Sequence, residues 1–115
     1  MGRGDADAGP MMQMLLHEGA IRDIRDIVEQ LSEDSAKAVE QFYHQLDAAA
    51  EFVVRHPEVG HPSGRFRRWN FKKFPYHLLY EVFSGSGELW IMVVRHDRRR
   101  PSYGMKRRPP DPWLL

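Results

Sequence analysis

The chain has 115 residues, of which 42% are hydrophobic, and its 17 Lys and Arg against 16 Asp and Glu leave a net charge of +1. A chain of this length builds one hydrophobic core, so we expect one domain. The absence of cysteine excludes a disulfide framework and a thiolate metal site, and it favours a reducing cytoplasm as the compartment. We expect neither a signal peptide nor a membrane span, because no stretch of about 18 residues is apolar throughout.

The two halves of the chain carry opposite net charges, although the net charge of the whole chain is close to zero. Residues 1–58 carry 5 Lys and Arg against 12 Asp and Glu, or −7, whereas residues 59–115 carry 12 against 4, or +8. One interpretation is a basic face built for phosphate or for an acidic protein partner. The other is that the two halves neutralise each other across the fold. The clustering of basic residues at the ends of predicted strands favours the first.

The N-terminal part of the chain predicts a leader and a short strand. Residues 1–10 are small, polar and rich in glycine, so we expect a disordered leader outside the fold. The short apolar run of residues 11–16 predicts an edge strand that pairs with a hairpin later in the chain.

Two amphipathic helices follow. From about His17 apolar residues recur at helical spacing, and Asp34 or Ser35 is a suitable N-cap for a second helix. The second helix ends near Arg55, because Pro57 disfavours a helical conformation of the residue before it. A link this short predicts an antiparallel helical hairpin, whose wide apolar stripe needs a sheet to cover it.

The next segment predicts a loop and then a strand. Residues 57–64 form a loop by composition, and residues 65–73 alternate apolar and basic side chains as a half-buried strand does. The aromatic residues of this strand cannot all share one face, so we expect a bulge or bend near Arg67 and Arg68.

A β-hairpin is the strongest local prediction. Residues 74–83 and 88–96 are rich in aromatic and β-branched residues, and the sequence SGSG between them predicts a loop of four. The elements together predict an α+β fold, with an N-terminal edge strand and an antiparallel helical hairpin packed on a twisted antiparallel sheet of three to four strands. We expect this domain to span residues 11–103, and residues 104–115, with three prolines, to form a C-terminal tail.

Five segments in this order resemble the RelE/ParE toxin superfamily. They are residues 17–20 (HEGA), the helical pair with Phe42, residues 56–60 (HPEVG), residues 74–81 (FPYHLLYE) and residues 94–103 (VRHDRRRPSY). The resemblance covers about residues 12–103. It implies a toxin of a type II toxin–antitoxin module, a plasmid-stabilisation protein held inactive by a cognate antitoxin in a hetero-oligomer. It also implies the fold predicted above.

Two activities occur in that superfamily. The RelE branch cuts mRNA on the ribosome by helping a ribose 2′-hydroxyl attack the next phosphate, which needs an acid–base group and cations. In that branch an arginine stands where this chain has His77, whose side chain titrates near neutrality. The resemblance matches the branch's catalytic tyrosine to Tyr103 and a strand-end arginine to the region of Arg98 and Arg99. The ParE branch inhibits DNA gyrase by binding and needs no catalytic group. The ending of this chain resembles ParE proteins more, so gyrase inhibition is the preferred prediction.

Basic residues are the expected contacts to the antitoxin and to gyrase or the ribosome. We expect an acidic antitoxin segment over residues 65–73 and 95–100, with contacts that weaken with salt. The candidates are Arg65, Arg67, Arg68, Lys72, Lys73, Arg95, Arg98, Arg99 and Arg100. The three consecutive arginines could equally be a solvated charge run.

Other interpretations of these residues stay open. His77 could be a hydrogen-bonded sheet histidine, and Tyr76 and Tyr80 are expected in the core. No cofactor is expected, and no metal, because His56 and His61 flank a loop without a third ligand. A third function, a non-toxic nucleic-acid-binding module, fits the basic strand with its interleaved aromatic residues.

Overall fold

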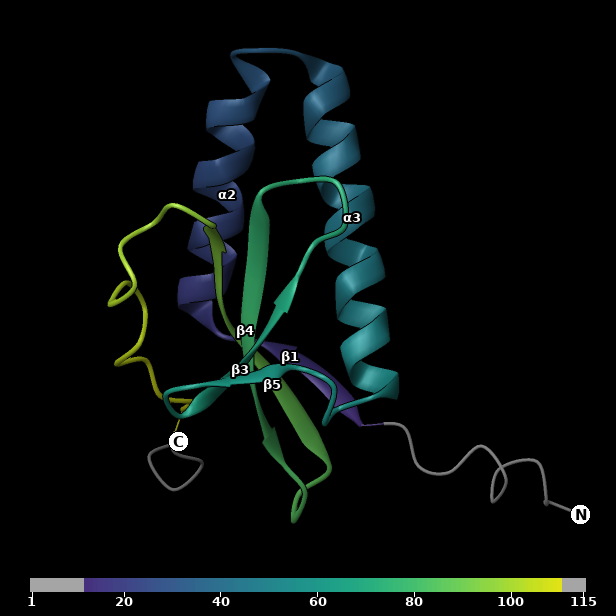
Figure 1. Cartoon of the computed structure of the whole chain (residues 1–115), viewed down its shortest axis with the longest axis vertical. Helices are drawn as coiled ribbons and strands as arrows, with labels where there is room; N and C mark the ends of the chain where they lie inside the picture. Colours follow the sequence, from purple (N-terminus) through teal and green to yellow (C-terminus); the bar gives the residue numbers. More distant parts are fainter. Residues whose placement is uncertain (1–11, 111–115) are drawn as a thin grey trace, which may run out of the picture.

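A helical hairpin covers one face of a five-stranded sheet (Figure 1). The computed structural model describes residues 12–110. In chain order the elements are β1 (Gln13–Leu16), α2 (Glu18–Ser32), α3 (Ala36–Arg55), β2 (His61–Ser63), β3 (Phe66–Asn70), β4 (Tyr76–Phe83) and β5 (Glu88–His96). Within residues 12–110 no helix combines the length and the apolar character needed to cross a membrane. The predictions for residues 1–10 and for the last five residues lie outside the described part of the chain.

The two helices form as their sequence patterns predict. Of the two predicted N-caps, Ser35 is the one that caps α3, and its hydroxyl accepts a hydrogen bond from the Ala38 amide at 3.0 Å. α3 ends at Arg55, two residues before Pro57. Half-buried apolar residues of α2 and fully buried ones of α3, such as Phe42 and Val53, form one cluster with the sheet.

The predicted α+β fold and its layers are confirmed, and the sheet is larger than expected. Its strand order is β1-β5-β4-β3-β2, so it has five strands in place of three to four. The additional strand, β2, lies inside the predicted loop, where His61–Ser63 pairs antiparallel with Phe66–Arg68. β1 is the expected edge strand, but it pairs parallel to β5 and not antiparallel, and two helices and three strands separate the two in the chain.

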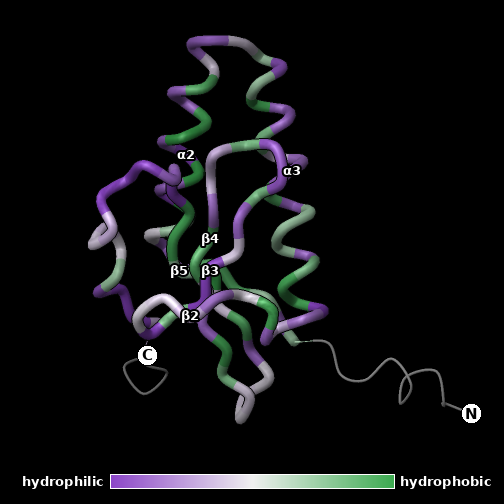
Figure 2. The backbone as a smooth tube through the Cα atoms, viewed as in Figure 1, coloured by the Kyte–Doolittle hydropathy of each residue, from purple (hydrophilic) through white to green (hydrophobic). Residues whose placement is uncertain are grey.

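β4 and β5 form the centre of the sheet and are its most hydrophobic part (Figure 2). The four-residue hairpin loop at residues 84–87 is confirmed. The expected bend near Arg67 and Arg68 is wrong, because β3 pairs regularly with β4 and Phe66 simply faces the side of the sheet away from the helices. The irregularity lies between β4 and β5 instead, where Leu79 pairs with Val93 and Tyr80 with Ile91, which leaves Met92 as the extra residue.

This bulge decides which side chains reach the far face of the sheet, meaning the face that the helices do not cover. Met92 and Val93 both belong to the cluster on the far face, whereas Ile91 and Val94 belong to the helix-facing core. After the bulge Arg95 lies opposite His77 on the neighbouring strand. The bulge therefore brings a charged residue of β5 beside the buried histidine.

The segment after β5 packs back onto the domain. It lies beside α2, on the side of that helix away from α3 (Figure 1). Tyr103 and Met105 pack against the far-face cluster, and Arg107 contacts both α2 and β5. Residues 104–110, expected to follow the domain as a tail, are thus in contact with two of its elements.

Candidate functional site

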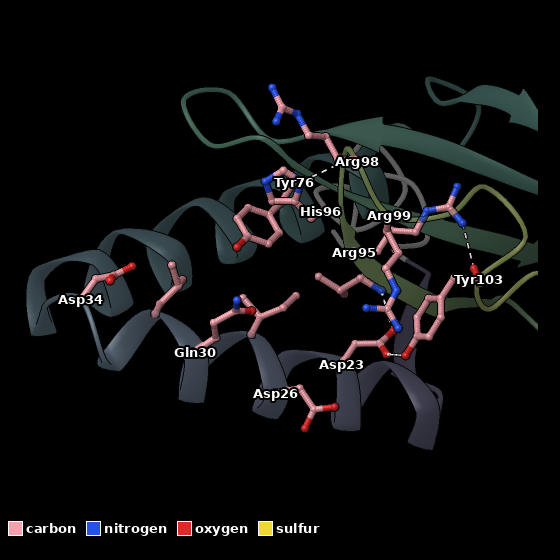
Figure 3. Close-up of a pocket in the computed structure, with 13 residues that line it drawn as sticks. Asp23, Asp26, Gln30, Asp34, Tyr76, Arg95, His96, Arg98, Arg99 and Tyr103 are labelled. Atoms are coloured by element: carbon pink, nitrogen blue, oxygen red, sulfur yellow. Dashed lines mark hydrogen bonds between the residues drawn. The ribbon is translucent and has the colours of Figure 1, made fainter.

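A groove of about 480 Å³ runs between α2 and the end of β5. One wall is α2, the other is the end of β5 with the turn that follows it, and Tyr76 at the start of β4 closes the floor (Figure 3). The lining residues are Asp23, Asp26, Ile27, Gln30, Leu31, Asp34, Tyr76, Val94, Arg95, His96, Arg98, Arg99 and Tyr103. The groove therefore joins the acidic first half of the chain to the basic second half.

One end of the groove is closed by a hydrogen-bonded triad of Asp23, Tyr103 and Arg107. Asp23 is only 4% exposed, and its Oδ1 accepts from the Tyr103 hydroxyl at 2.6 Å and from Arg107 Nη2 at 3.1 Å. Its Oδ2 accepts from Arg107 Nη1 at 2.7 Å, so the arginine binds the carboxylate with two nitrogens. Arg107 Nη2 also donates to the Tyr103 hydroxyl at 3.1 Å. A buried carboxylate is stable here because each of its oxygens has charged and neutral donors.

The same triad completes the hydrogen bonding of β5 where β1 ends. β1 pairs with Glu88–Ile91 and goes no further. Beyond that point the Val94 amide donates to Asp23 Oδ2 at 3.0 Å, and the Met92 carbonyl accepts from Arg107 Nη1 at 2.9 Å. An aspartate and an arginine thus satisfy backbone groups of β5 that a neighbouring strand would otherwise satisfy.

A second polar chain lies on the far face and fixes the turn after β5. Arg95 Nε donates to His77 Nε2 at 2.9 Å, and its Nη1 donates to the carbonyls of Pro101 and Tyr103 at 2.9 and 2.8 Å. Because an arginine can only donate, His77 Nε2 accepts, and the proton on Nδ1 is donated to Asp97 at 2.8 Å. His77 is therefore neutral and connects Asp97 to Arg95.

Burial is the main cause of the pKa shifts of His77, Arg95 and Tyr103. Burial lowers the pKa of His77. The hydrogen bond to Asp97 opposes this shift, and the nearby cations of Arg68 and Arg95 add to it. Burial also lowers the pKa of Arg95 and, together with Asp23, raises the pKa of the Tyr103 hydroxyl. At neutral pH the Tyr103 hydroxyl is therefore protonated, and the His77 ring carries a single proton and no charge.

The three residues proposed for a nuclease do not share one open site. His77 is 1% exposed and both of its ring nitrogens are engaged on the far face. The Tyr103 hydroxyl is bonded to Asp23 and Arg107 at the end of the groove. Arg98 is exposed, and its side chain extends away from α2 (Figure 3).

The nine predicted basic contacts fall into three groups. Arg67 and Arg95 donate hydrogen bonds within the domain. Arg67 donates to the carbonyls of Glu58 and Gly60, and Arg95 donates to the carbonyl of Pro101. Arg68 pairs with Asp97 at 3.5 Å. The others are exposed: Arg65 precedes β3, Lys72 and Lys73 follow it, and Arg98, Arg99 and Arg100 follow β5.

Asp23 and Arg107 were not predicted from the sequence. A signal existed for Asp23, because Ala20, Asp23 and Ile27 follow one another at helical spacing and so place a carboxylate within the apolar stripe of α2. No local pattern distinguishes Arg107 from its basic neighbours. Within residues 12–110 no three acidic or histidine side chains are grouped as metal ligands would be.

Comparison with known structures gives the fold a context. The structure of the chromosomal ParDE system of P. aeruginosa matches with a TM-score of 0.58 at 20% identity, over 75% of this chain and 96% of that one. The RelBE2 toxin–antitoxin complex of Mycobacterium tuberculosis matches with a TM-score of 0.53 at 16% identity, over 75% of this chain and 91% of that one. An arginine-to-alanine double mutant of E. coli RelE in the free state matches with a TM-score of 0.61 at 16% identity, over 84% of this chain and 97% of that one. At these identities the likeness concerns the fold.

A comparison with sequence families is more specific. A search of curated proteins finds no significant match. The model of the family described as "ParE toxin of type II toxin-antitoxin system, parDE" matches residues 14–101, which include every strand and both helices from the second residue of β1 onward. The chain accordingly belongs to the ParE toxin family of type II toxin–antitoxin systems.

Proposed function

We propose that this toxin inhibits DNA gyrase in the cytoplasm by binding, and that a cognate antitoxin neutralises it in a hetero-oligomer. Membership of the ParE family supports the target. The observation that carries the mechanism is the state of His77, which is buried, neutral and bonded at both nitrogens. A general base must reach the proton that it removes, and this ring faces the interior of the protein.

The surface offered to gyrase consists of the exposed cations at one end of the sheet. Lys72 and Lys73 follow β3, and the turn after β5 carries Arg98 and Arg100 in exposed positions. The Arg95 side chain supports that turn from beneath by bonding the carbonyls of Pro101 and Tyr103. Arg95 was expected as a contact, and the geometry favours a positioning role for it instead.

Two assays run side by side test this function. Purified gyrase is assayed for supercoiling, and programmed ribosomes are assayed for mRNA cleavage, each with the full chain. We expect loss of supercoiling and intact mRNA. Ribosome-dependent cuts with normal supercoiling would contradict gyrase inhibition and support a RelE-like mRNA endoribonuclease. No effect in either assay would contradict both activities and favour a non-toxic nucleic-acid-binding module.

A pair of variants with equal charge change locates the surface. Arg98→Glu with Arg100→Glu should abolish inhibition of supercoiling, since each charged contact contributes about 1.5–3 kcal/mol. Arg22→Glu with Arg25→Glu alters two exposed arginines of α2 and should leave inhibition intact. Equal loss in both pairs would mean that net charge, and not this surface, matters.

A further inference from the structure

Two histidine nitrogens hold the turn after β5 by accepting hydrogen bonds. His77 Nε2 accepts from Arg95 Nε at 2.9 Å, and Arg95 in turn bonds two backbone carbonyls of the turn. His96, the last residue of β5, accepts the Arg98 amide on its Nδ1 at 3.0 Å (Figure 3). A backbone amide and an arginine can only donate, so both of these ring nitrogens lack a proton.

Protonation of either histidine removes one of these acceptors. A protonated imidazole donates from both of its nitrogens and accepts from neither. On His77 the added proton takes the acceptor away from Arg95 Nε and places two cations side by side in a buried site. On His96 the added proton turns an N–H group towards the N–H of Arg98. Each event therefore breaks one attachment of the turn to the sheet.

The charged groups around His77 act against one another. Asp97 accepts its Nδ1 proton at 2.8 Å, whereas Arg95 of β5 and Arg68 of β3 are nearby cations. The Asp97 carboxylate is shared with Arg68 at 3.5 Å, and Asn70, which lies opposite His77 on β3, is uncharged. Burial first, and then the two cations, lower the pKa of His77 against the hydrogen bond to Asp97. His77 therefore gains its second proton at a lower pH than an ordinary histidine does.

His96 occupies a different environment, at the wall of the groove. Its ring is half-buried, and the Tyr76 ring of β4 packs edge-on against it at 4.9 Å between centres. The charged groups that line the groove with it are Asp23, Asp26, Asp34, Arg95, Arg98 and Arg99. Because the ring borders an open groove, a proton from solvent reaches it without any opening of the core. One of the two histidines is thus accessible and the other is buried.

We propose that the turn after β5 is a pH-sensitive element that positions the gyrase contacts. With both histidines neutral, the turn presents Arg98 and Arg100 in one fixed arrangement. Protonation of His77 or His96 releases the turn and weakens the complex with gyrase, and the change is reversible. The two histidines are positioning residues, because they act through the turn. The inference rests on the proposed function in naming gyrase as the partner.

The order of the turn is measured on the toxin alone. The full chain is labelled with ¹⁵N and titrated from pH 7.5 to 5.0, while the Arg95 Nε–H signal, the Arg98 amide signal and the heteronuclear NOE of residues 98–100 are followed. We expect both signals to shift and the NOE to fall, reversibly, while Val53 in the helix-facing core keeps its NOE. An unchanged NOE at residues 98–100 while both histidine rings titrate would overturn the proposal. An equal fall at Val53 would also overturn it, because the whole fold would then be lost.

Variants that keep the acceptors but cannot gain the proton assign the effect. His77→Gln places an amide oxygen near Nε2, and His96→Asn places one near Nδ1, so the double variant should keep its NOE down to pH 5.0. His44→Gln with His61→Asn makes the same changes at exposed histidines of α3 and β2, and this pair should follow the parent. A double variant that loosens with pH as the parent does, or a control pair that does not, would contradict the assignment. The titration of the parent decides the proposal even where a substitution itself loosens the turn.

Binding to purified gyrase connects the turn to function. At pH 6.0 a histidine of ordinary pKa, about 6.5, is about three-quarters protonated. The parent should therefore bind gyrase up to about fourfold more weakly at pH 6.0 than at pH 7.5, relative to the double variant measured at the same two pH values. Equal changes in the parent and the double variant would overturn the proposed link. Absence of binding at pH 7.5 would contradict gyrase as the target, whereas the titration of the toxin alone would still decide whether the turn responds to protons.

Discussion

The two faces of the sheet are stabilised by different physical means. On the helix-facing side, Phe42 and Leu78 are fully buried in one continuous apolar cluster. On the far face the apolar cluster is small, and beside it the Asp97–His77–Arg95 chain orders the turn after β5. Apolar burial needs only shape and volume, whereas the polar chain needs each donor to find its acceptor. The turn after β5 is therefore held by polar contacts, which depend more on pH and salt than apolar packing does.

The largest expected effect comes from breaking the helix-facing side. Phe42→Ala removes a ring that lies 5.3 Å from Tyr76 and 5.8 Å from Phe71, centre to centre. The cavity and the lost transfer free energy should lower the free energy of unfolding by about 3–5 kcal/mol. Urea unfolding at pH 7 measures it, and the loss should be the same at low and high salt.

A somewhat smaller loss is expected from the triad at the edge of β5. Asp23→Ala leaves Arg107, the Val94 amide and the Tyr103 hydroxyl without their acceptor, and should cost about 2–4 kcal/mol, since the Arg107 side chain retains 16% exposure and some hydration. Asp26→Ala, on the exposed side of the same helix, should change the free energy of unfolding by less than about 0.5 kcal/mol. Similar losses for the two variants would show that the triad does not stabilise the fold.

The smallest effect, and the one that separates the two faces most sharply, is a dependence on pH. Burial lowers the pKa of His77 in the folded chain, so the unfolded chain binds a proton more readily. The contribution of His77 to stability is therefore complete above the unfolded pKa of about 6.5 and is lost as pH falls towards the folded value. Unfolding of the parent chain and of His77→Gln at pH 7.5 and 5.5 should show a steeper loss in the parent. Parallel pH profiles would refute this role.

Sequence patterns predicted the helix-facing side better than the far face. The apolar spacing of α2 and α3 and the hairpin of β4 and β5 depend on neighbours in sequence, and these elements form as predicted. The bulge at Met92 lies within this hairpin, but no local signal marks it in the sequence, and the parallel pairing of β1 joins segments 75 residues apart, so local periodicity revealed neither. The Asp23–Arg107 pair joins residues 84 positions apart, and its members look like two ordinary surface charges in the sequence.

The parallel pairing of β1 with β5 has a consequence for the order in which the chain is made. Gln13 pairs with Glu88, so the strand synthesised first waits for a partner that is synthesised 75 residues later. At bacterial rates of up to about 20 residues per second this delay is roughly four seconds or more. During it the helical hairpin is present while the sheet that buries its apolar stripe is missing. The turn with Arg98, Arg99 and Arg100 is synthesised only after both helices and all five strands.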